Sequence, residues 1–313
     1  MSLFSKLINP RFPPAALGLE SSNATVVHLD SGRGGYTIRR AATVTLPENL
    51  LRPSFDEQNI ADSNTLVGLL SEVALSAGLG KQRKWSVALP EASARATIIT
   101  LESAPASRAE LEEVLRWKYE RAFGATESEL RVSRERLSAD AQGRQRYLAV
   151  GIRLAVLDEY EAVFDAMGWR TGLILPRHQG EACWVTRPGG DSLLISSHSE
   201  GFTALVLRDK QPAIVRSVMC EAEDRDDELY RLLLFYRDRV ASGDGVTDAH
   251  TALERLLVVG EGFDKEHVGE LVNETLEARP RILEPADVGL ALPSNELSFD
   301  ALAAPAGLAT LAW

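Results

Sequence analysis

The N-terminal part of the chain has the pattern of a β-meander followed by a helix and a further strand. Residues 15–29 place two apolar runs on either side of a polar turn, and a second turn at 32–35 leads to an alternating segment that ends at Pro47. This pattern predicts three short strands joined by tight turns. Leucines at helical spacing predict a helix over 63–77, and an apolar run at 85–89 predicts a short buried strand.

The middle of the chain predicts a second α/β unit. Ser107 is a helix N-cap, and Glu110, three residues later, completes a capping box. The expected order is strand, helix, two strands, helix, strand, which is a split βαβ layout. These elements are expected at residues 94–101, 109–123, 129–137, 146–154, 156–167 and 171–175.

The C-terminal part opens, like the N-terminal part, with a β-meander whose first turn is polar. The hairpin 191–212 is followed by an apolar segment that ends at Val218, so three strands are predicted. Two α/β halves with a similar beginning therefore flank the middle unit. The remaining elements are expected at 226–241 (helix), 256–259 (strand), 260–262 (sharp turn), 263–276 (helix), 281–283 (edge strand) and 297–313 (helix).

The composition is that of a globular protein with a sizeable core. With 313 residues and 45% hydrophobic content, two domains are expected. The net charge of −11 argues against a nucleic-acid binder, because neutralising phosphates needs clustered Lys and Arg. No apolar run approaches the ~18 residues of a membrane helix. A short apolar patch at 3–8 lacks the features of a signal peptide, and it is either a docked tail or a weak membrane contact.

The residue pattern gives little support to metal or nucleophile chemistry. Cys183, Cys220 and the five histidines lack metal-ligand spacing, and a reducing compartment is expected. His198 lies among serines, but no acid is placed to orient its imidazole, so catalysis there is not expected. The acids of 221–228 are expected to cap the following helix, since they meet the positive end of its dipole.

In this order the segments resemble the actin-like superfamily and, within it, the type IV pilus assembly protein PilM family. The resemblance spans nearly the whole chain. Its most specific piece is the middle unit, where a strand leads to a helix that begins ELEEVLRW at 110–117. Such an inserted subdomain occurs in PilM and FtsA but not in actin itself. The resemblance implies an α/β, actin-like (ribonuclease H-like) two-domain fold with an inserted α+β subdomain.

The resemblance also implies domain boundaries. An N-terminal actin-like subdomain is expected at 1–90 with 173–190, the inserted subdomain at 91–172, and a C-terminal actin-like subdomain at 191–313. The family's small subdomain, which covers the adenine, is expected to be missing, because only ~7 residues separate Val218 from the next predicted helix. Its loss removes apolar burial on which the affinity of a nucleotide pocket depends.

In the family, ATP lies between the two halves, on two phosphate loops and a glycine-rich adenosine loop. Acids in the phosphate loops hold Mg²⁺, and glycines let backbone N–H groups approach the phosphates. Here the metal-binding acid of the second loop is replaced by a serine, and a histidine fills a glycine position. We therefore expect a degenerate site, with no ATP hydrolysis, no resident metal or cofactor, and no tight binding of Mg·ATP. Its residues are Glu20, Ser21, Ser22, Ser196, His198, Thr203, Gly260 and Gly262.

A partner is implied as well. In the PilM family, the groove between the inserted subdomain and the N-terminal half binds the short cytoplasmic N-terminal tail of the membrane protein PilN. An extended tail gains affinity from main-chain hydrogen bonds and side-chain pockets. Leu111, Leu115 and Trp117 of the inserted helix, with the strand 94–101, are the candidate wall of this groove. Whether the chain also associates with itself stays open.

The expected function is that of a cytoplasmic PilM-like scaffold of type IV pilus or related secretion assembly. It would be peripheral to the inner membrane through its PilN-like partner and would carry out no catalysis. The alternative is a functional actin-like ATP-binding protein or ATPase with divergent phosphate loops. A third candidate is the cytoplasmic domain of a type II secretion protein such as GspL, which differs because it continues into a transmembrane helix.

Overall fold

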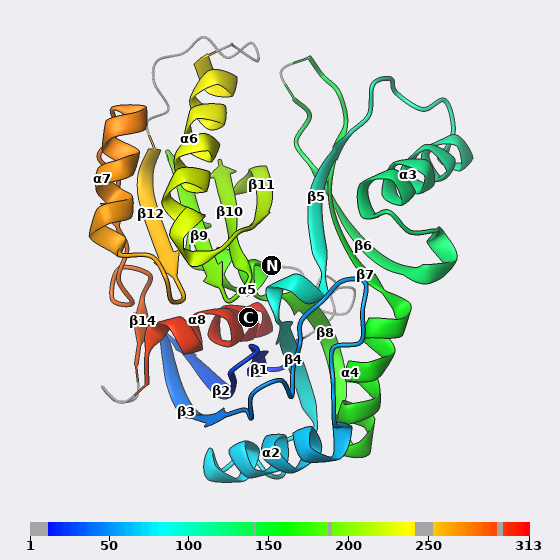
Figure 1. Ribbon diagram of the computed structural model, residues 1–313, viewed down its shortest axis with the longest axis vertical. Helices are drawn as coiled ribbons and strands as arrows, with labels where there is room; N and C mark the ends of the chain where they lie inside the picture. Colours follow the sequence, from blue (N-terminus) through cyan, green and yellow to red (C-terminus); the bar gives the residue numbers. More distant parts are fainter. Residues whose placement is uncertain (1–11, 141, 187–189, 242–252, 293–296) are drawn as a thin grey trace.

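The computed structural model describes residues 12–140, 142–186, 190–241, 253–292 and 297–313. The apolar patch at 3–8 lies outside these residues. Three β-sheets organise the described chain (Figure 1). A six-stranded sheet forms the N-terminal lobe, a five-stranded sheet forms the C-terminal lobe, and a three-stranded sheet forms the inserted subdomain.

The sheet of the N-terminal lobe has the strand order β14-β3-β2-β1-β4-β8. The meander strands β1 and β2 are antiparallel, and β1 is parallel to β4. Helices α2 and α4 pack on one face of this sheet, where their apolar stripes share a core with alternate residues of β1 and β2. The bounds are β1 Ala15–Leu19, β2 Asn23–Gly32, β3 Gly35–Thr45, β4 Lys84–Leu89, β8 Arg170–Pro176, β14 Leu290–Ala291, α2 Ser63–Ser76 and α4 Leu154–Ala166.

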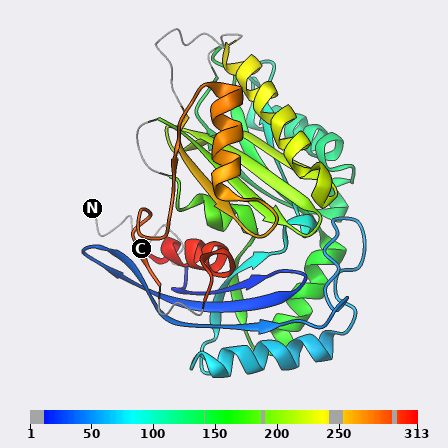
Figure 2. The same ribbon diagram turned by 60° about the vertical axis from the view of Figure 1, so that its left-hand side comes forward.

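The sheet of the C-terminal lobe repeats this topology, with the order β11-β10-β9-β12-β13. Its first strand, β9, is antiparallel to β10 and parallel to β12, so the predicted likeness between the two meanders is confirmed. Helices α6 and α7 cover its outer face (Figure 2). The bounds are β9 Asp191–His198, β10 Gly201–Arg208, β11 Gln211–Met219, β12 Leu253–Val259, β13 Arg281–Ile282, α6 Arg225–Ala241 and α7 Lys265–Leu276.

A helical layer lies between the two sheets and joins the lobes. Helices α5 (Arg177–Ala182) and α8 (Phe299–Ala309) share one core with inward-facing residues of both sheets. The approach of α8 to the N-terminal sheet is close, because a Cβ at Gly18 would lie 2.9 Å from the ring of Pro305. Strands that are buried on both faces need nearly continuous apolar runs, and β1 and β9 both have them.

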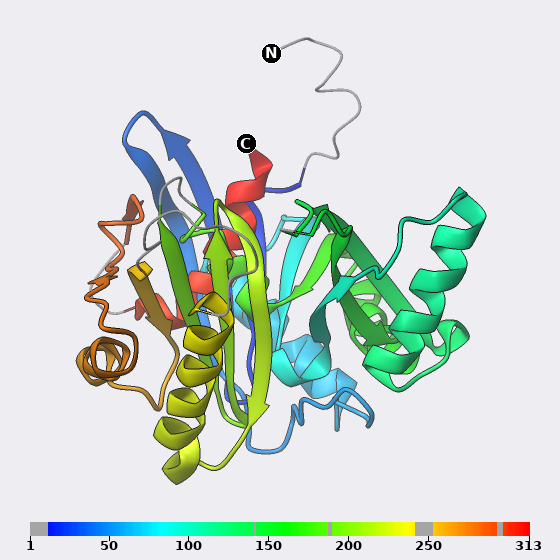
Figure 3. The same ribbon diagram turned by 90° about the horizontal axis from the view of Figure 1, so that it is seen from above.

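The inserted subdomain stands beside the C-terminal lobe (Figure 3). Its sheet has the order β5-β7-β6 and is covered by α3. The predicted N-cap is confirmed, since the Ser107 side chain accepts a hydrogen bond from the Glu110 amide, and Gly124 ends the helix in the left-handed conformation. The bounds are η1 Glu91–Ser93, β5 Arg95–Thr100, α3 Arg108–Phe123, η2 Glu127–Glu129, β6 Leu130–Leu137 and β7 Arg146–Arg153.

Four elements pack outside the unit in which their sequence pattern placed them, although residues 173–176 of β8 lie in the range that we assigned to the N-terminal subdomain. Strand β8 pairs with β4 in the N-terminal sheet, and α4 packs beside α2, so the middle unit does not close into a split βαβ sheet. From the C-terminal end, β14 pairs with β3 and α8 packs on β1 and β2. Strand β8 forms the edge of the N-terminal sheet, where it lies parallel to the buried strand β4.

The expected short connection after the C-terminal meander is present. Only the one-turn helix η3 (Ala222–Asp224) separates β11 from α6, so no subdomain stands at this position. Helix α7 begins at Lys265 instead of residue 263, because Asp264 is its N-cap. Within the described part of the chain, none of the helices combines the length and the apolar composition needed to cross a membrane.

Candidate functional site

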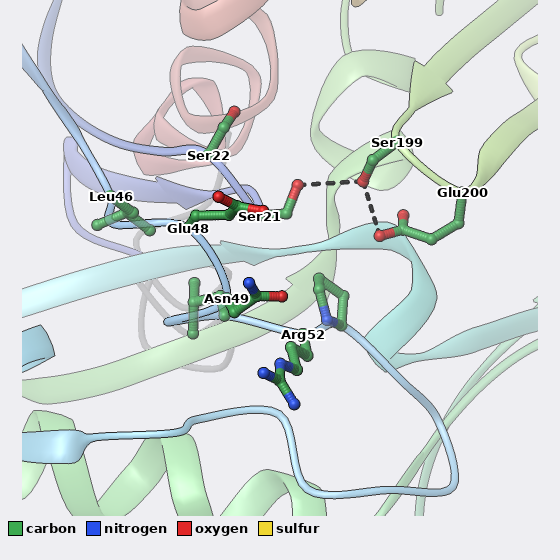
Figure 4. A pocket seen from close by; sticks show the side chains of 10 residues that line it. Ser21, Ser22, Leu46, Glu48, Asn49, Arg52, Ser199 and Glu200 are labelled. Carbon is green, nitrogen blue, oxygen red and sulfur yellow. Dashed lines mark hydrogen bonds between the residues drawn. The ribbon is translucent and has the colours of Figure 1, made fainter. Parts of the chain in front are cut away.

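The candidate site lies where the two lobes meet, at the tips of the first hairpin of each lobe. The β1–β2 turn and the β9–β10 turn approach each other so closely that the hydroxyls of Ser21 and Ser199 form a hydrogen bond of 3.0 Å (Figure 4). We call the space on the inner side of this contact, among Glu20, Glu91, Arg177 and His198, the interlobe cleft. The two predicted phosphate loops are therefore in direct contact with each other.

An open hollow of about 520 Å³ lies on the solvent side of the contact, and we call it the outer hollow. It is lined by the two turns and by the segment 46–53 that follows β3 (Figure 4). Its charged lining residues are Arg52, Glu48 and Glu200. A polyphosphate in this hollow would meet one cation and two acids, which is a poor environment for an anion.

In the interlobe cleft, the side chain of Arg177, from α5, lies against the first predicted phosphate loop. Its guanidinium is almost completely buried, with Nη1 2.9 Å from Oε1 of Glu20 and Nε 2.7 Å from Oε1 of Glu181. Burial disfavours the charge of Arg177, but the two carboxylates outweigh it and raise the pKa above its usual value. Glu20 is the acid that would serve a metal ion in this loop, and here it neutralises a guanidinium.

A second buried charge, Glu91, lies beside Arg177. Thr203 donates a hydrogen bond of 2.8 Å to its Oε1, and Nδ1 of His178 lies 2.6 Å from the same atom. The backbone N–H of His178 donates to Oε2 at 3.2 Å. Burial alone would raise the pKa of Glu91, but the charge and hydrogen bond of His178, helped by His198 and Thr203, lower it to about 2. Glu91 is therefore a carboxylate over the whole neutral range.

Arg225, the first residue of α6, packs against the β9–β10 turn and the turn that follows β12, both in the C-terminal lobe. Its guanidinium donates to Oγ of Ser197 at 2.8 Å, to the carbonyl of His198 at 2.7 Å and to the carbonyl of Glu261 at 2.9 Å. A Cβ at Gly262 would lie 1.8 Å from Nη1 of Arg225. The predicted adenosine turn is therefore packed against the protein's own guanidinium.

The remaining space inside the cleft is small. A cavity of about 20 Å³ lies among Glu20, Glu91, Arg177 and His198, which is room for about one water molecule. Ligand pockets usually have several hundred Å³. The space among these four residues therefore has no room for a nucleotide, whereas the outer hollow is large enough but has two acids among its three charged lining residues.

Most of the predicted nucleotide-site residues meet at this cleft. Ser22 instead lines the outer hollow. The hydroxyl of Ser196 is fully buried beside Glu181, whose pKa is raised by burial and lowered in part by Arg177 and Ser196. Those at or beside the cleft are Glu20, Ser21, Ser196, His198, Thr203, Gly260 and Gly262.

Sequence reasoning missed the residues that fill the cleft. Glu91 follows β4 and Arg177 follows β8, so both stand just beyond the carboxyl end of a parallel strand. In open α/β sheets, functional side chains gather at these ends. Charged residues just after two predicted strands were therefore a usable signal. Arg225 had no comparable signal, because it lies within a charged run.

The candidate partner residues are in different environments. Leu115 is completely buried in the core of the inserted subdomain, and Leu111 packs against that core. Leu115 is therefore not available for contact with a partner, because the single apolar face of α3 already covers its own sheet. Trp117 is 55% exposed, with the guanidinium of Arg121 5.5 Å from its ring centroid.

In the described residues no group of three or more His, Cys, Asp or Glu side chains is placed to hold a metal ion.

No protein-family model matches the chain, and no curated protein matches it in sequence. Its structure is similar to that of a PilM–PilN type IV pilus biogenesis complex, with a TM-score of 0.72 and 16% identity over 97% of this chain and 99% of that chain. A Bacteroides thetaiotaomicron protein with an actin-like ATPase fold and unknown function has a TM-score of 0.48 and 12% identity, with coverage of 99% of both chains. The cytoplasmic domain of EpsL, from the type II secretion system of Vibrio cholerae, has a TM-score of 0.45 and 15% identity, with coverage of 95% and 93%. The expected α/β, actin-like fold of the PilM type is confirmed.

Proposed function

We propose that this chain is a PilM-like scaffold of a type IV pilus or a related secretion machine, and that it performs no catalysis. The fold that it shares with PilM, a protein that forms a complex with PilN, supports the scaffold role. The absence of catalysis is inferred mainly from Arg177, whose buried guanidinium lies in the interlobe cleft and pairs with Glu20, the acid of the first loop. The proposal places the protein in the cytoplasm, held at the inner membrane by a PilN-like partner.

The cleft chemistry disfavours the alternative of a functional ATPase. Mg²⁺ needs oxygen ligands at close to octahedral geometry, and the first-loop acid, Glu20, is paired with Arg177. The second loop offers the buried hydroxyl of Ser196 where an acid would stand. Binding a nucleotide would require two buried guanidinium groups to leave their partners, and breaking such contacts costs several kcal/mol.

Titration with Mg·ATP separates the two functions. We expect no binding heat up to millimolar Mg·ATP in isothermal titration calorimetry, and no phosphate release above the buffer rate. A functional ATP-binding protein would instead show micromolar binding, weakened by Glu20→Ala. That result would overturn the proposal that the cleft is inactive, while leaving the partner function to its own test.

The partner-binding role is proposed for the exposed face of α3. Trp117 is the large apolar side chain that α3 offers to solvent, and tryptophan is enriched among the residues that dominate binding energies. Arg121 stacks over its ring and leaves a flat amphipathic surface. Such a surface suits an extended tail with an apolar side chain and an acceptor group.

We expect Trp117→Ala to weaken binding of a PilN-like tail about tenfold, since truncating a hot-spot tryptophan costs more than about 1 kcal/mol. Fluorescence anisotropy with a labelled tail peptide of the PilN-like protein from the same genome measures this. Leu75→Ala is the matched control, because Leu75 is also exposed but lies on α2. Equal affinities for both variants would place the tail elsewhere, and no binding by the wild-type protein would contradict the scaffold proposal.

A further inference from the structure

Glu91 is the point at which three parts of the molecule are joined. It lies in η1, which connects β4 of the N-terminal lobe to β5, the first strand of the inserted subdomain. Its carboxylate accepts hydrogen bonds from His178 of α5 and from Thr203 of β10. The base of the inserted subdomain, the helical layer and the C-terminal lobe therefore meet at one buried side chain.

The contacts of Glu91 continue into both lobes. Thr203 also bonds to Ser217 of β11 at 2.8 Å, so the attachment reaches two strands of the C-terminal sheet. Two residues from Glu91, the Ser93 hydroxyl donates to Oδ1 of Asn59 at 2.6 Å and lies 3.1 Å from the hydroxyl of Tyr160 in α4. Thus η1 is bonded on one side to the C-terminal lobe and on the other to the N-terminal lobe.

Two exposed hydrogen bonds at the edge of the cleft, which we call rim contacts, also join these parts of the molecule. The Ser21–Ser199 hydrogen bond crosses between the lobes. The inserted subdomain reaches the start of β11 where the Ser138 amide donates to the side chain of Gln211 at 2.6 Å. These rim contacts are exposed, whereas Glu91, His178 and Thr203 are buried. Charge-assisted hydrogen bonds in a buried, low-dielectric environment are stronger than exposed neutral ones.

We propose that Glu91, with His178 and Thr203, is a ligand-independent interlobe lock that fixes the two lobes and the inserted subdomain in one arrangement. No bound molecule is needed to close the cleft, since all three groups belong to the chain itself. Loss of one contact leaves a buried carboxylate short of a partner, so each contact that is removed weakens the lock. The lock concerns the arrangement of the domains and does not depend on the partner proposed above.

Hydrogen–deuterium exchange of the full chain tests the lock. Glu91→Gln is expected to raise exchange about tenfold in β9–β10 (191–208) and in η1–β5 (91–100), with α2 (63–76) unchanged, because the loss of a charged hydrogen bond is worth at least about 1.4 kcal/mol. Thr203→Val should raise exchange in the same peptides by a smaller factor. Wild-type exchange there is expected to be the same with and without millimolar Mg·ATP.

Thr43→Val is the matched control. It removes a hydroxyl–hydroxyl bond of 2.9 Å between Thr25 and Thr43, inside the N-terminal sheet, and should leave the cleft peptides unchanged. If Glu91→Gln fails to fold, Thr203→Val decides alone. An unchanged rate in β9–β10, an equal rise in α2, or added protection of the wild-type cleft by Mg·ATP would each overturn the lock. None of these outcomes bears on tail binding, which anisotropy measures separately.

Discussion

Arg177→Met is expected to lower the free energy of unfolding by about 3–5 kcal/mol, the usual cost of removing one partner from a buried ion pair. Arg177 and Glu181 are both buried, and the guanidinium also faces Glu20. After the substitution, Glu181 would remain as a buried acid without its cation. Chemical denaturation followed by circular dichroism measures the loss.

A second substitution shows whether the unpaired acid is the cause. Arg177→Met combined with Glu181→Leu is expected to recover most of the lost stability, because replacing a buried ion pair by apolar groups is often close to neutral. Arg39→Met is the exposed control, and it should cost less than about 1 kcal/mol, since Arg39 and Asp30 form a solvent-exposed pair. A double variant as unstable as Arg177→Met would show that the guanidinium stabilises the cleft by a route other than its pairing with Glu181.

Much of the fold could be predicted because its signals are local. Polar turns between apolar runs identified both meanders, and the Ser107 cap identified the start of α3. The pairing of β8 with β4, and of β14 with β3, could not be predicted in this way. Such pairings depend on which strand still has an unpaired backbone edge once the rest of the sheet has formed. Residues far apart in the sequence determine this.

The site could be predicted only in outline. The positions of the two phosphate loops follow from the meander turns, and the structure brings Ser21 and Ser199 of these turns together. The charged groups that pack against the loops could not be predicted from the loops themselves, because Arg177 and Arg225 come from other elements. The burial of Leu115 was also missed, since helical spacing identifies an apolar face but does not say whether that face meets the protein's own sheet or a partner.

The glycines of the predicted adenosine turn have a second explanation in the structure. Gly260 has φ +93°, a conformation that side chains rarely adopt, and a Cβ there would lie 2.2 Å from the carbonyl oxygen of Ser197. The Gly260 amide also donates to Asp300 of α8 at 3.0 Å. The turn therefore needs glycine to pack against its own lobe, whether or not a nucleotide ever binds.

Gly260→Ala is accordingly expected to lower the free energy of unfolding by about 2–5 kcal/mol, as the sum of backbone strain and a steric clash. Gly168→Ala is the matched control, because Gly168 has φ +65° and a Cβ there would meet no heavy atom within 4 Å. It should cost about 1 kcal/mol from the left-handed conformation alone. Denaturant unfolding of both variants gives the difference. If the two losses were equal, the contact with Ser197 would contribute nothing. If Gly260→Ala kept its stability but changed nucleotide affinity, the glycine would serve a ligand, and the proposal that the nucleotide site is inactive would be wrong.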